Sequence, residues 1–530
     1  MEKYSLNVKT PICGGYLSSI QIDLLSIIQC NSIEDLIDFI KNCDQINHIK
    51  GIFESINGLD LESAKSSIFK KYQDTMVFHN KSKTEARLKR LEYLGLSTEQ
   101  EILEVIEGIR PNSKELLELN HHFISEERDQ AKSEDLYEEM VLLNKELTCF
   151  NSFLIGSGKI YNVINKYMRD NDKKYDFYHA KRGLDFAYKN GKQVRFHSLL
   201  VREDFGQFED LDKERIIRII KEYVKETIDF ITNYNINHKI IINGKEEPII
   251  NAVDLFNEII SFDKMIFDKD MNKWLYYKEI DGEYKVVIDD KNKIYRDLKE
   301  GEVPEYQNIW YIKYGISMQE LMSCFDYALQ NKPVGVSYLY NEPFLENDDR
   351  RRKVLETLLE IDSLKPGLID TLGSQMHITI NQDIDSIKRC FIDFKRLQES
   401  TGKKIQITEF DMSLGKNDVL RVFGTNADMT LEQVYDDKDK KISEISNVIN
   451  SSGVNISGVS YWSLTDGTDC NLERLRTNAL TNHQIKDIKQ IPTACGGLIP
   501  THKELIKKKE LDQMLSDSTI SDNHIKERII

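Results

Sequence analysis

The sequence predicts an α/β fold, a (β/α)8 TIM barrel with an added N-terminal helical region and a β-hairpin insertion after strand 4. Three observations lead to this prediction. Short strand-like apolar runs alternate with longer amphipathic segments, a pattern typical of a parallel sheet. Seven such runs follow residue 148, and the 530 residues can hold a barrel of more than about 250 residues.

The first region, residues 1–110, carries helical patterns and no chemistry that we can identify. Apolar residues recur at helical spacing in 32–43 and again in 84–97. We predict a small helical N-terminal region there, whose role is unknown.

The predicted barrel occupies residues 111–490. Its strand-like runs lie at 149–155, 192–201, 248–256, 335–341, 371–378, 404–410 and 458–464. The helix candidates between them lie at 214–234, 318–331, 385–401 and 441–453. An eighth strand must close a barrel, and the segment HHFISEE at 121–127 is the candidate that we assign to it.

A hairpin insertion at about 268–305 interrupts this alternation. Two β-rich runs flank Asp281-Gly282, a dipeptide that favours a tight hairpin turn. Its aromatic residues offer either a stacking platform for a ligand or simple packing against the barrel, and these residues are Trp274, Tyr276, Tyr277 and Tyr284. After the barrel, residues 491–530 form a predicted charged C-terminal tail.

Composition excludes several classes of protein. The formal net charge is -16, and 72 basic residues face 88 acidic ones, so we expect no nucleic-acid partner. No run of about 18 apolar residues and no signal peptide are visible, which predicts a cytoplasmic protein with no membrane contact. The eight cysteines are scattered and lack ligand spacing, so we expect free thiols and no zinc site.

Two glutamates are the candidate catalytic residues of this sequence. Glu258 follows Asn257 at the end of one strand-like run, and Glu409 lies at the end of another three strand-helix units later. In a parallel barrel, catalytic groups project from the carboxyl ends of the strands. A pair of carboxylates placed in this way is what hydrolysis of a glycosidic bond requires.

The segments around these glutamates resemble glycoside hydrolase family 10, the endo-β-1,4-xylanases. INAVDLFNEII is similar to the strand-four motif WDVVNEA, which implies that Glu258 is the acid/base and that Asn257 contacts the sugar. KIQITEFDM is similar to the strand-seven motif ITELDI, which implies that Glu409 is the nucleophile.

Four further motifs follow in the family's order and cover the remaining barrel strands. QVRFHSLLV resembles the stretch ending in GHTLVW, SYLYNEPF resembles YYNDYN, LGSQMHI resembles GLQSHL, and GVSYWSLTD resembles VWGVSD. The resemblance implies that the substrate-binding residues include His197, Gln375, His377 and Trp462. His377 lies two residues after Gln375, so both side chains would share one face of a strand.

The chain departs from the family where the sugar on the non-reducing side is bound. Against the strand-two motif ENEMK, Lys159 matches the lysine, but Ile155 and Gly156 replace glutamate and asparagine. Val201 stands where a tryptophan is expected, and so does Cys470. These changes predict weaker or different sugar selection, because a polar site owes its discrimination to such partners.

The resemblance implies a retaining enzyme that cleaves β-1,4-xylosidic bonds in xylan or xylo-oligosaccharides, with its two carboxyl groups about 5–5.5 Å apart. The expected partner is therefore a β-linked oligosaccharide or polysaccharide, and the implied mechanism requires neither a metal nor an organic cofactor. Two alternatives stay open. One is a retaining glycosidase for a different β-linked sugar, and the other is a non-catalytic carbohydrate-binding barrel. The sequence does not fix the oligomeric state.

Overall fold

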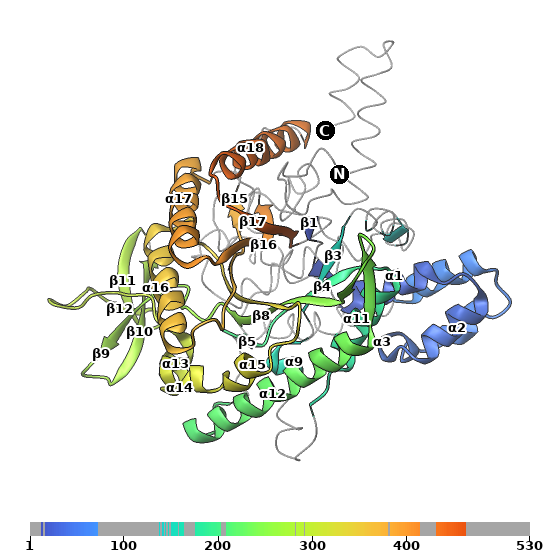
Figure 1. Cartoon of the computed structure of the whole chain (residues 1–530), viewed down its shortest axis with the longest axis horizontal. Coiled ribbons are helices and arrows are strands. Elements are labelled where there is room, and N and C mark those ends of the chain that lie inside the picture. The colour runs from blue at the N-terminus through green and yellow to red at the C-terminus, as the bar shows by residue number, and fades with distance from the viewer. Residues whose placement is uncertain are drawn as a thin grey trace, which may run out of the picture.

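The computed structural model describes residues 12–13, 16–17, 19–72, parts of 137–163, 175–202, 208–413 apart from 281, 291, 380 and 381, and 431–462. Its central element is a parallel sheet that forms a ring around the middle of the molecule (Figure 1). The predicted TIM barrel is therefore confirmed. The domain limits that we derived from the sequence stay a prediction. The N-terminal strands described below bear on the limit between the first region and the barrel.

Eight strand positions form the ring, and each pairs with its neighbours in parallel. The first position is shared by two short strands, β1 (Ile12–Cys13) and β2 (Tyr16–Leu17). The other seven, in chain order, are β3 (Ser152–Ile155), β4 (Gln193–Phe196), β8 (Ile250–Asn257), β13 (Ser337–Glu342), β14 (Thr371–Ser374), β16 (Lys404–Ser413) and β17 (Ile456–Tyr461). Two short extensions, β5 (Leu200–Val201) and β15 (His377–Thr379), pair with β8 and β16.

The strand that closes the barrel is not the one that we predicted. β1 pairs with β17 and β2 pairs with β3, so residues 12–17 close the ring between the last strand and the second. The segment 121–127, which we assigned to this position, lies outside the described residues. The closing strand therefore comes from the region 1–110, which we predicted to be helical.

Amphipathic helices cover the outside of the ring (Figure 1). They include α11 (Tyr178–Lys189), α12 (Lys213–Asn237), α16 (Asp348–Leu364), α17 (Ile384–Thr401) and α18 (Leu431–Ser451). Side-chain caps fix where they begin: Asp212 accepts from the amide of Arg215, and Asn347 accepts from that of Arg350. The predicted helix at 318–331 is instead two short ones, α14 (Met318–Ser323) and α15 (Asp326–Gln330).

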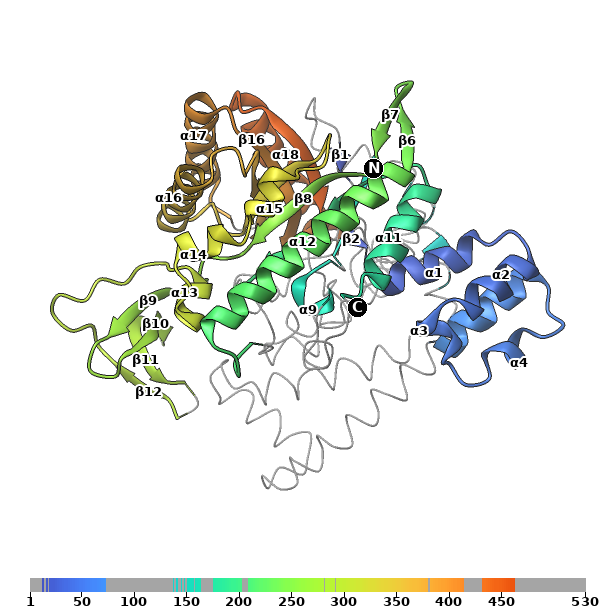
Figure 2. The ribbon, with the colours of Figure 1, turned by 60° about the horizontal axis from the view of Figure 1, so that its bottom comes forward.

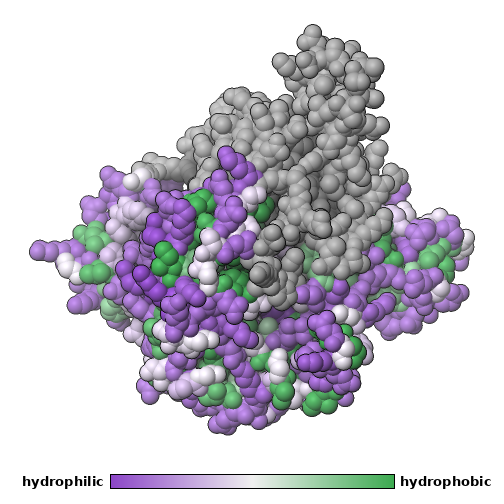
Figure 3. Space-filling view, turned by 45° about the horizontal axis from the view of Figure 1, so that its top comes forward, coloured by the Kyte–Doolittle hydropathy of each residue, from purple (hydrophilic) through white to green (hydrophobic). Residues whose placement is uncertain are grey.

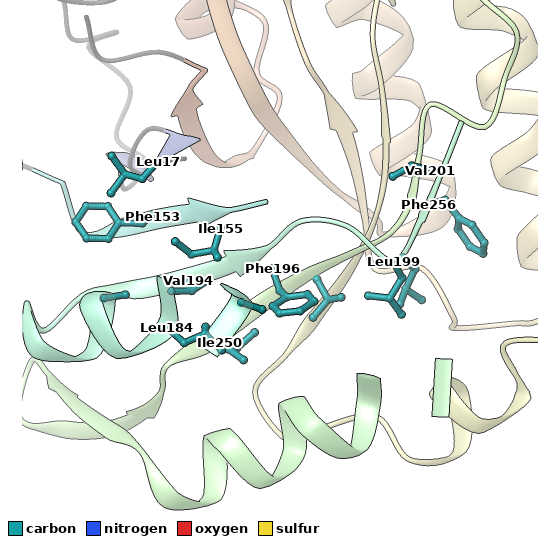
Figure 4. Close-up of a cluster of buried hydrophobic side chains, with 14 of the residues drawn as sticks. Leu17, Phe153, Ile155, Leu184, Val194, Phe196, Leu199, Val201, Ile250 and Phe256 are labelled. Atoms are coloured by element: carbon teal, nitrogen blue, oxygen red, sulfur yellow. The ribbon is translucent and has the colours of Figure 1, made fainter. Parts of the chain in front are cut away.

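The core lies between the ring and these helices. Figure 4 shows one part of it, in which Phe153, Val194, Phe196 and Ile250 lie among the strands and the neighbouring helices. All four are at most 1 % exposed. Burial of such side chains is the main source of stability in a barrel of this size.

Helices α1 to α4 extend from one end of the barrel, opposite the β-rich insertion (Figure 2). Their bounds are Ser19–Gln29, Ile33–Lys41, Asp44–Asn47 and Ile52–Ile56, so the helix predicted in 32–43 is confirmed. Asp23 on α1 pairs with Arg182 on α11, and Asp23 is 1 % exposed. This ion pair joins the N-terminal helices to the barrel.

The insertion after β8 is larger than the predicted hairpin. It is a four-stranded antiparallel sheet of β9 (Lys264–Asp268), β10 (Lys273–Ile280), β11 (Glu283–Asp289) and β12 (Ile294–Arg296). The predicted turn is present between β10 and β11, where Gly282 has a φ of 84°. A second antiparallel pair, β6 (Lys239–Ile242) with β7 (Lys245–Pro248), precedes β8 and was not predicted.

The register of this sheet bears on its aromatic residues. Side chains alternate between faces along a strand, so Trp274 and Tyr276 lie on one face and Tyr277 on the other. Tyr277 lies beside Tyr284, with ring centroids 5.5 Å apart. The four aromatic residues therefore cannot form one common platform.

The visible described surface is mainly hydrophilic, with small scattered apolar patches (Figure 3). Among the described helices, none has both the length and the apolar character needed to cross a membrane.

Candidate active site

The predicted site residues meet at the carboxyl ends of the barrel strands. His197 directly follows β4, Glu258 follows β8, Gln375 follows β14 and Trp462 follows β17. Together with four others they line one cavity of about 320 Å³, and the eight are Lys159, His197, Asn257, Glu258, Gln375, His377, Glu409 and Trp462. The other lining residues are Val201, Arg202, Phe262, Pro343 and Phe344.

Glu409 lies on β16 and is only 2 % exposed. Burial raises the pKa of its carboxyl, but this effect is outweighed by the hydrogen bond from His377 and by the charges of His197, His377 and Arg195. The result is a pKa lowered to about 2. Asn341 Nδ2 also donates to Glu409 Oε1 at 2.7 Å, and His377 Nε2 lies 3.2 Å from Oε2. Glu409 is therefore held as a carboxylate.

Glu258 occupies a strained position at the end of β8. Its φ is 58°, in the left-handed region that a glutamate rarely adopts. Its amide donates to the carbonyl of Asn341 at 2.9 Å, and Gln375 Nε2 donates to its Oε1 at 2.9 Å. Arg202 Nε lies 3.5 Å from its other oxygen. Glu258 is thus held by a residue of β13 and by the residues that directly follow β14 and β5.

Side-chain amides connect the two glutamates. Asn257 Oδ1 accepts from Gln375 Nε2 at 3.2 Å and from Asn341 Nδ2 at 2.9 Å. Gln375 also binds Glu258, and Asn341 also binds Glu409. The network therefore fixes both carboxylates relative to Asn257.

The histidines of the site are each oriented by a buried aspartate. His197 Nδ1 lies 2.6 Å from Asp254 Oδ2, and His377 Nδ1 lies 2.7 Å from Asp411 Oδ1. Trp462 packs edge-to-face with both imidazoles, with centroids 5.7 Å from His377 and 6.4 Å from His197. The indole therefore forms a wall of the cavity beside the histidines.

The departures from the family motifs have clear structural positions. Ile155 is fully buried in the core and does not line the cavity, and Gly156 is buried beside it. Val201 does line the cavity, with no polar atom on its side chain to offer. Cys470 lies outside the described residues.

Several site residues were missed from the sequence. Asn341 is fully buried and bonds both Asn257 and Glu409, while Asp254 and Asp411 orient the histidines. Asn341 falls within SYLYNEPF, a motif already aligned with the family, so its asparagine could have been identified. The aspartates precede or follow site residues by two to four positions on the same strand, which gave only a weak signal.

Within the described ranges, no group of three or more His, Cys, Asp or Glu side chains could hold a metal ion. The described cysteines that are free and buried are Cys30, Cys43, Cys324 and Cys390.

Comparison with known proteins gives similar sequences among xylanases. Endo-1,4-beta-xylanase A of Thermoanaerobacterium saccharolyticum is 23% identical over 260 residues, which is 47% of this chain and 18% of that protein. The same-named enzyme of Thermotoga neapolitana is 24% identical over 301 residues, 55% of this chain and 22% of that protein. The chain thus spans only about a fifth of the length of these curated relatives.

Solved structures of xylanases are also similar. The intracellular xylanase TsXylA of Thermoanaerobacterium saccharolyticum matches with a TM-score of 0.40 and 17% identity, covering 61% of this chain and 80% of that one. Native xylanase 10B of Thermotoga maritima matches with a TM-score of 0.40 and 17% identity, covering 62% and 80%.

The family model described as Glycosyl hydrolase family 10 matches residues 162–487, well over half of the chain. This range includes both glutamates and all but one of the predicted site residues, Lys159. The chain therefore belongs to glycosyl hydrolase family 10.

Proposed function

We propose that this protein is a retaining glycoside hydrolase that cleaves β-1,4-xylosidic bonds in xylan or xylo-oligosaccharides by double displacement. The observation that carries the proposal is the unequal treatment of two carboxyl groups in one cavity. Glu409 is buried and held ionised, with a pKa of about 2, while Glu258 is partly exposed to the same cavity. A nucleophile and a separate proton donor need this difference.

In the first step, a Glu409 oxygen attacks the anomeric carbon while the bond to the leaving oxygen breaks. The electron pair of that bond goes to the leaving oxygen, which takes the proton of Glu258. In the second step, Glu258 removes a proton from water, and the hydroxide oxygen displaces Glu409 from the anomeric carbon. Two displacements at one carbon restore its configuration.

The remaining lining residues would bind the sugar. Asn257 Oδ1 already accepts two hydrogen bonds, so we assign its Nδ2 to a sugar hydroxyl. Trp462 would pack against an apolar sugar face, and His197 and Lys159 would bond hydroxyls on the non-reducing side. Similarity to proteins named endo-1,4-beta-xylanase supports xylan as the substrate.

A second candidate is a retaining glycosidase for a different β-linked sugar. Ile155 in the core and Val201 in the cavity wall favour it, because neither supplies a hydrogen bond on the non-reducing side. A non-catalytic barrel is disfavoured, since a binding site has no need for a buried carboxylate held ionised by two histidines and an arginine.

The test is hydrolysis of aryl β-xylobiosides, with the anomer of the first product followed by NMR. We expect retention, and we expect Glu409→Ala to abolish turnover. Glu258→Ala should slow substrates with poor leaving groups about 10²–10⁴-fold. The surface variant Glu399→Ala is the control. Turnover only on aryl glycosides of other sugars would favour the second candidate, and inversion would contradict the proposed mechanism.

The cytoplasmic location and the absence of a nucleic-acid partner stay predictions.

A further inference from the structure

Two charged residues beside the site take no part in the mechanism above, although both are buried. Glu342 ends β13 and is fully buried, and Arg350 on α16 is 1 % exposed. Their side chains form an ion pair, with Arg350 Nη2 2.7 Å from Glu342 Oε2. Burial raises the pKa of Glu342 to about 7, while the Arg350 charge opposes this shift. Burying such a pair costs free energy, which its contacts must offset.

The contacts of this pair converge on the two residues that precede Phe262. The amide of Ile260 donates to Glu342 Oε1 at 3.1 Å, and its carbonyl accepts from Arg350 Nη2 at 3.2 Å. Arg350 Nη1 donates to the carbonyl of Ser261. Arg350 Nε donates to the carbonyl of Pro343 at 2.9 Å, which ties the same guanidinium to the end of β13.

The segment bound by this ion pair, Ile260 and Ser261, begins two residues after Glu258. The φ of Glu258 is 58°, which marks a strained backbone. Such a conformation is unfavourable and persists only where neighbouring contacts fix it. On the N-terminal side, the Glu258 amide is fixed by the carbonyl of Asn341. On the C-terminal side, backbone bonds join Ile259 and Ser261 to the segment 307–309, and Glu342 and Arg350 add the side-chain contacts described above.

The same guanidinium also supports the wall of the cavity. Its carbon lies 5.3 Å from the ring centroid of Phe262, which lines the cavity, and 5.6 Å from that of Tyr306. Arg202, which contacts Glu258, lies over Phe262 at 4.0 Å. Movement of Arg350 would therefore move both the backbone and the ring beside Glu258.

We infer that Arg350 and Glu342 are positioning residues for Glu258, holding its carboxyl where it can protonate the leaving oxygen. This inference rests on the proposed function, because it assigns to Glu258 the role of proton donor. Neither residue lines the cavity, so both act through the segment 258–262. Misplacing a proton donor by about 1 Å is enough to cost about 10²-fold in rate.

A matched control is available in the next residue of the same helix. Arg351 is 3 % exposed and pairs with Asp348 and with Asp393 at 2.9 Å. Its guanidinium also donates to the carbonyl of Leu345, so it joins α16 to α17 and the loop after β13. Arg351→Lys therefore disturbs a similarly buried arginine whose ion pairs and hydrogen bonds go to Asp348, Asp393 and Leu345.

The experiment compares Arg350→Lys, Glu342→Gln and Arg351→Lys with the wild type on two aryl β-xylobiosides. A 2,4-dinitrophenolate leaves without a proton, whereas phenol needs the acid. We expect kcat/KM on the phenyl substrate to fall about 10–100-fold in the first two variants. On the dinitrophenyl substrate we expect less than about a threefold change, and Arg351→Lys should change neither.

Thermal unfolding shows which variants are folded at the assay temperature. Glu342→Gln keeps the side-chain volume and serves as the second variant if Arg350→Lys is unfolded. Equal losses on both substrates, or no loss on either, would overturn the positioning role. A wild type that hydrolyses neither substrate would instead overturn the proposed function itself.

Discussion

At the scale of single residues, His377 links the nucleophile to a second carboxylate. Its Nε2 faces Glu409 and its Nδ1 faces Asp411, so one imidazole is held between two acids. Asp411 is fixed within β16 and is 1 % exposed. The imidazole therefore has a set orientation towards Glu409 before any sugar binds.

Replacing this imidazole should change the acid side of the pH profile. Burial alone would raise the pKa of Glu409, and the His377 hydrogen bond is the largest effect that lowers it. In His377→Ala the nucleophile should take up its proton at higher pH, so the acid limb of kcat/KM should move up by about 1–3 pH units. Profiles on an aryl β-xylobioside measure this.

His238→Ala, at the end of α12, is the control and should leave the limb in place. An unmoved acid limb in His377→Ala would contradict the prediction.

The lowered pKa of Glu409 also affects the stability of the fold. Because the pKa of Glu409 is lowered in the folded state, its contribution is present above about pH 4.5 and is lost as the pH falls towards 2.

The sequence predicted the two glutamates, which lie at or near strand ends, but missed the residues that hold them in place. Glu258 and Glu409 were found because a strand-like run ends at each. Asn341 contacts Glu409 across 68 positions, and Arg350 reaches Ile260 across 90. Such pairs depend on how strands and helices are placed in space, which periodicity along the chain does not report.

At the scale of elements, the sheet of β9 to β12 has a small core of its own. Ile266, Leu275 and Val286 form a separate buried cluster, with Tyr277 and Leu298 packed against it. An ion pair joins Arg296 on β12 to Asp268 on β9, the two outer strands of this sheet. The sheet is therefore stabilised largely by its own contacts.

Leu275→Ala should loosen this sheet and spare the catalytic site. Loss of a buried leucine costs about 2–5 kcal/mol, and here the cost falls on the separate cluster. We expect faster hydrogen exchange in residues 264–296 and a kcat/KM within about twofold of the wild type. Tyr276→Ala, 48 % exposed, is the control. A large loss of activity would show that the sheet supports the site.

The sequence predicted β10 and β11 because Asp281-Gly282 marks their turn. The outer strands were missed for different reasons. β9 follows the catalytic segment without a turn signal, and β12 has only three residues. Short edge strands carry too few residues for alternation to be recognised.

At the scale of the whole molecule, the barrel depends on a few N-terminal residues. Leu17 pairs with Ile155 of β3 and is 2 % exposed (Figure 4). Leu17→Asp should lower the melting temperature strongly, because a carboxylate would then be buried in place of an apolar side chain. Circular dichroism and activity measure the effect.

Phe53→Asp is the control, since Phe53 is 39 % exposed on α4. Equal stability of the two variants would show that residues 12–17 are dispensable for the barrel.

The sequence did not identify this closing strand because its strand residues come in two pairs separated by Gly14-Gly15. No run of alternation exists in IC-GG-YL, and only pairing with β17 and β3 makes these residues a strand. The seven other strands were found, since each has at least four residues and lies in a strand-like apolar run of the sequence.

The pairing of Ile12 with Val459 also determines when the ring can close during synthesis. A ribosome makes about 5–20 residues per second, so the first strand waits tens of seconds for its last neighbour. Until then β1 and β16 each present an open edge that another chain could pair with. We therefore expect the yield of folded protein to depend on how these edges are protected in the nascent chain.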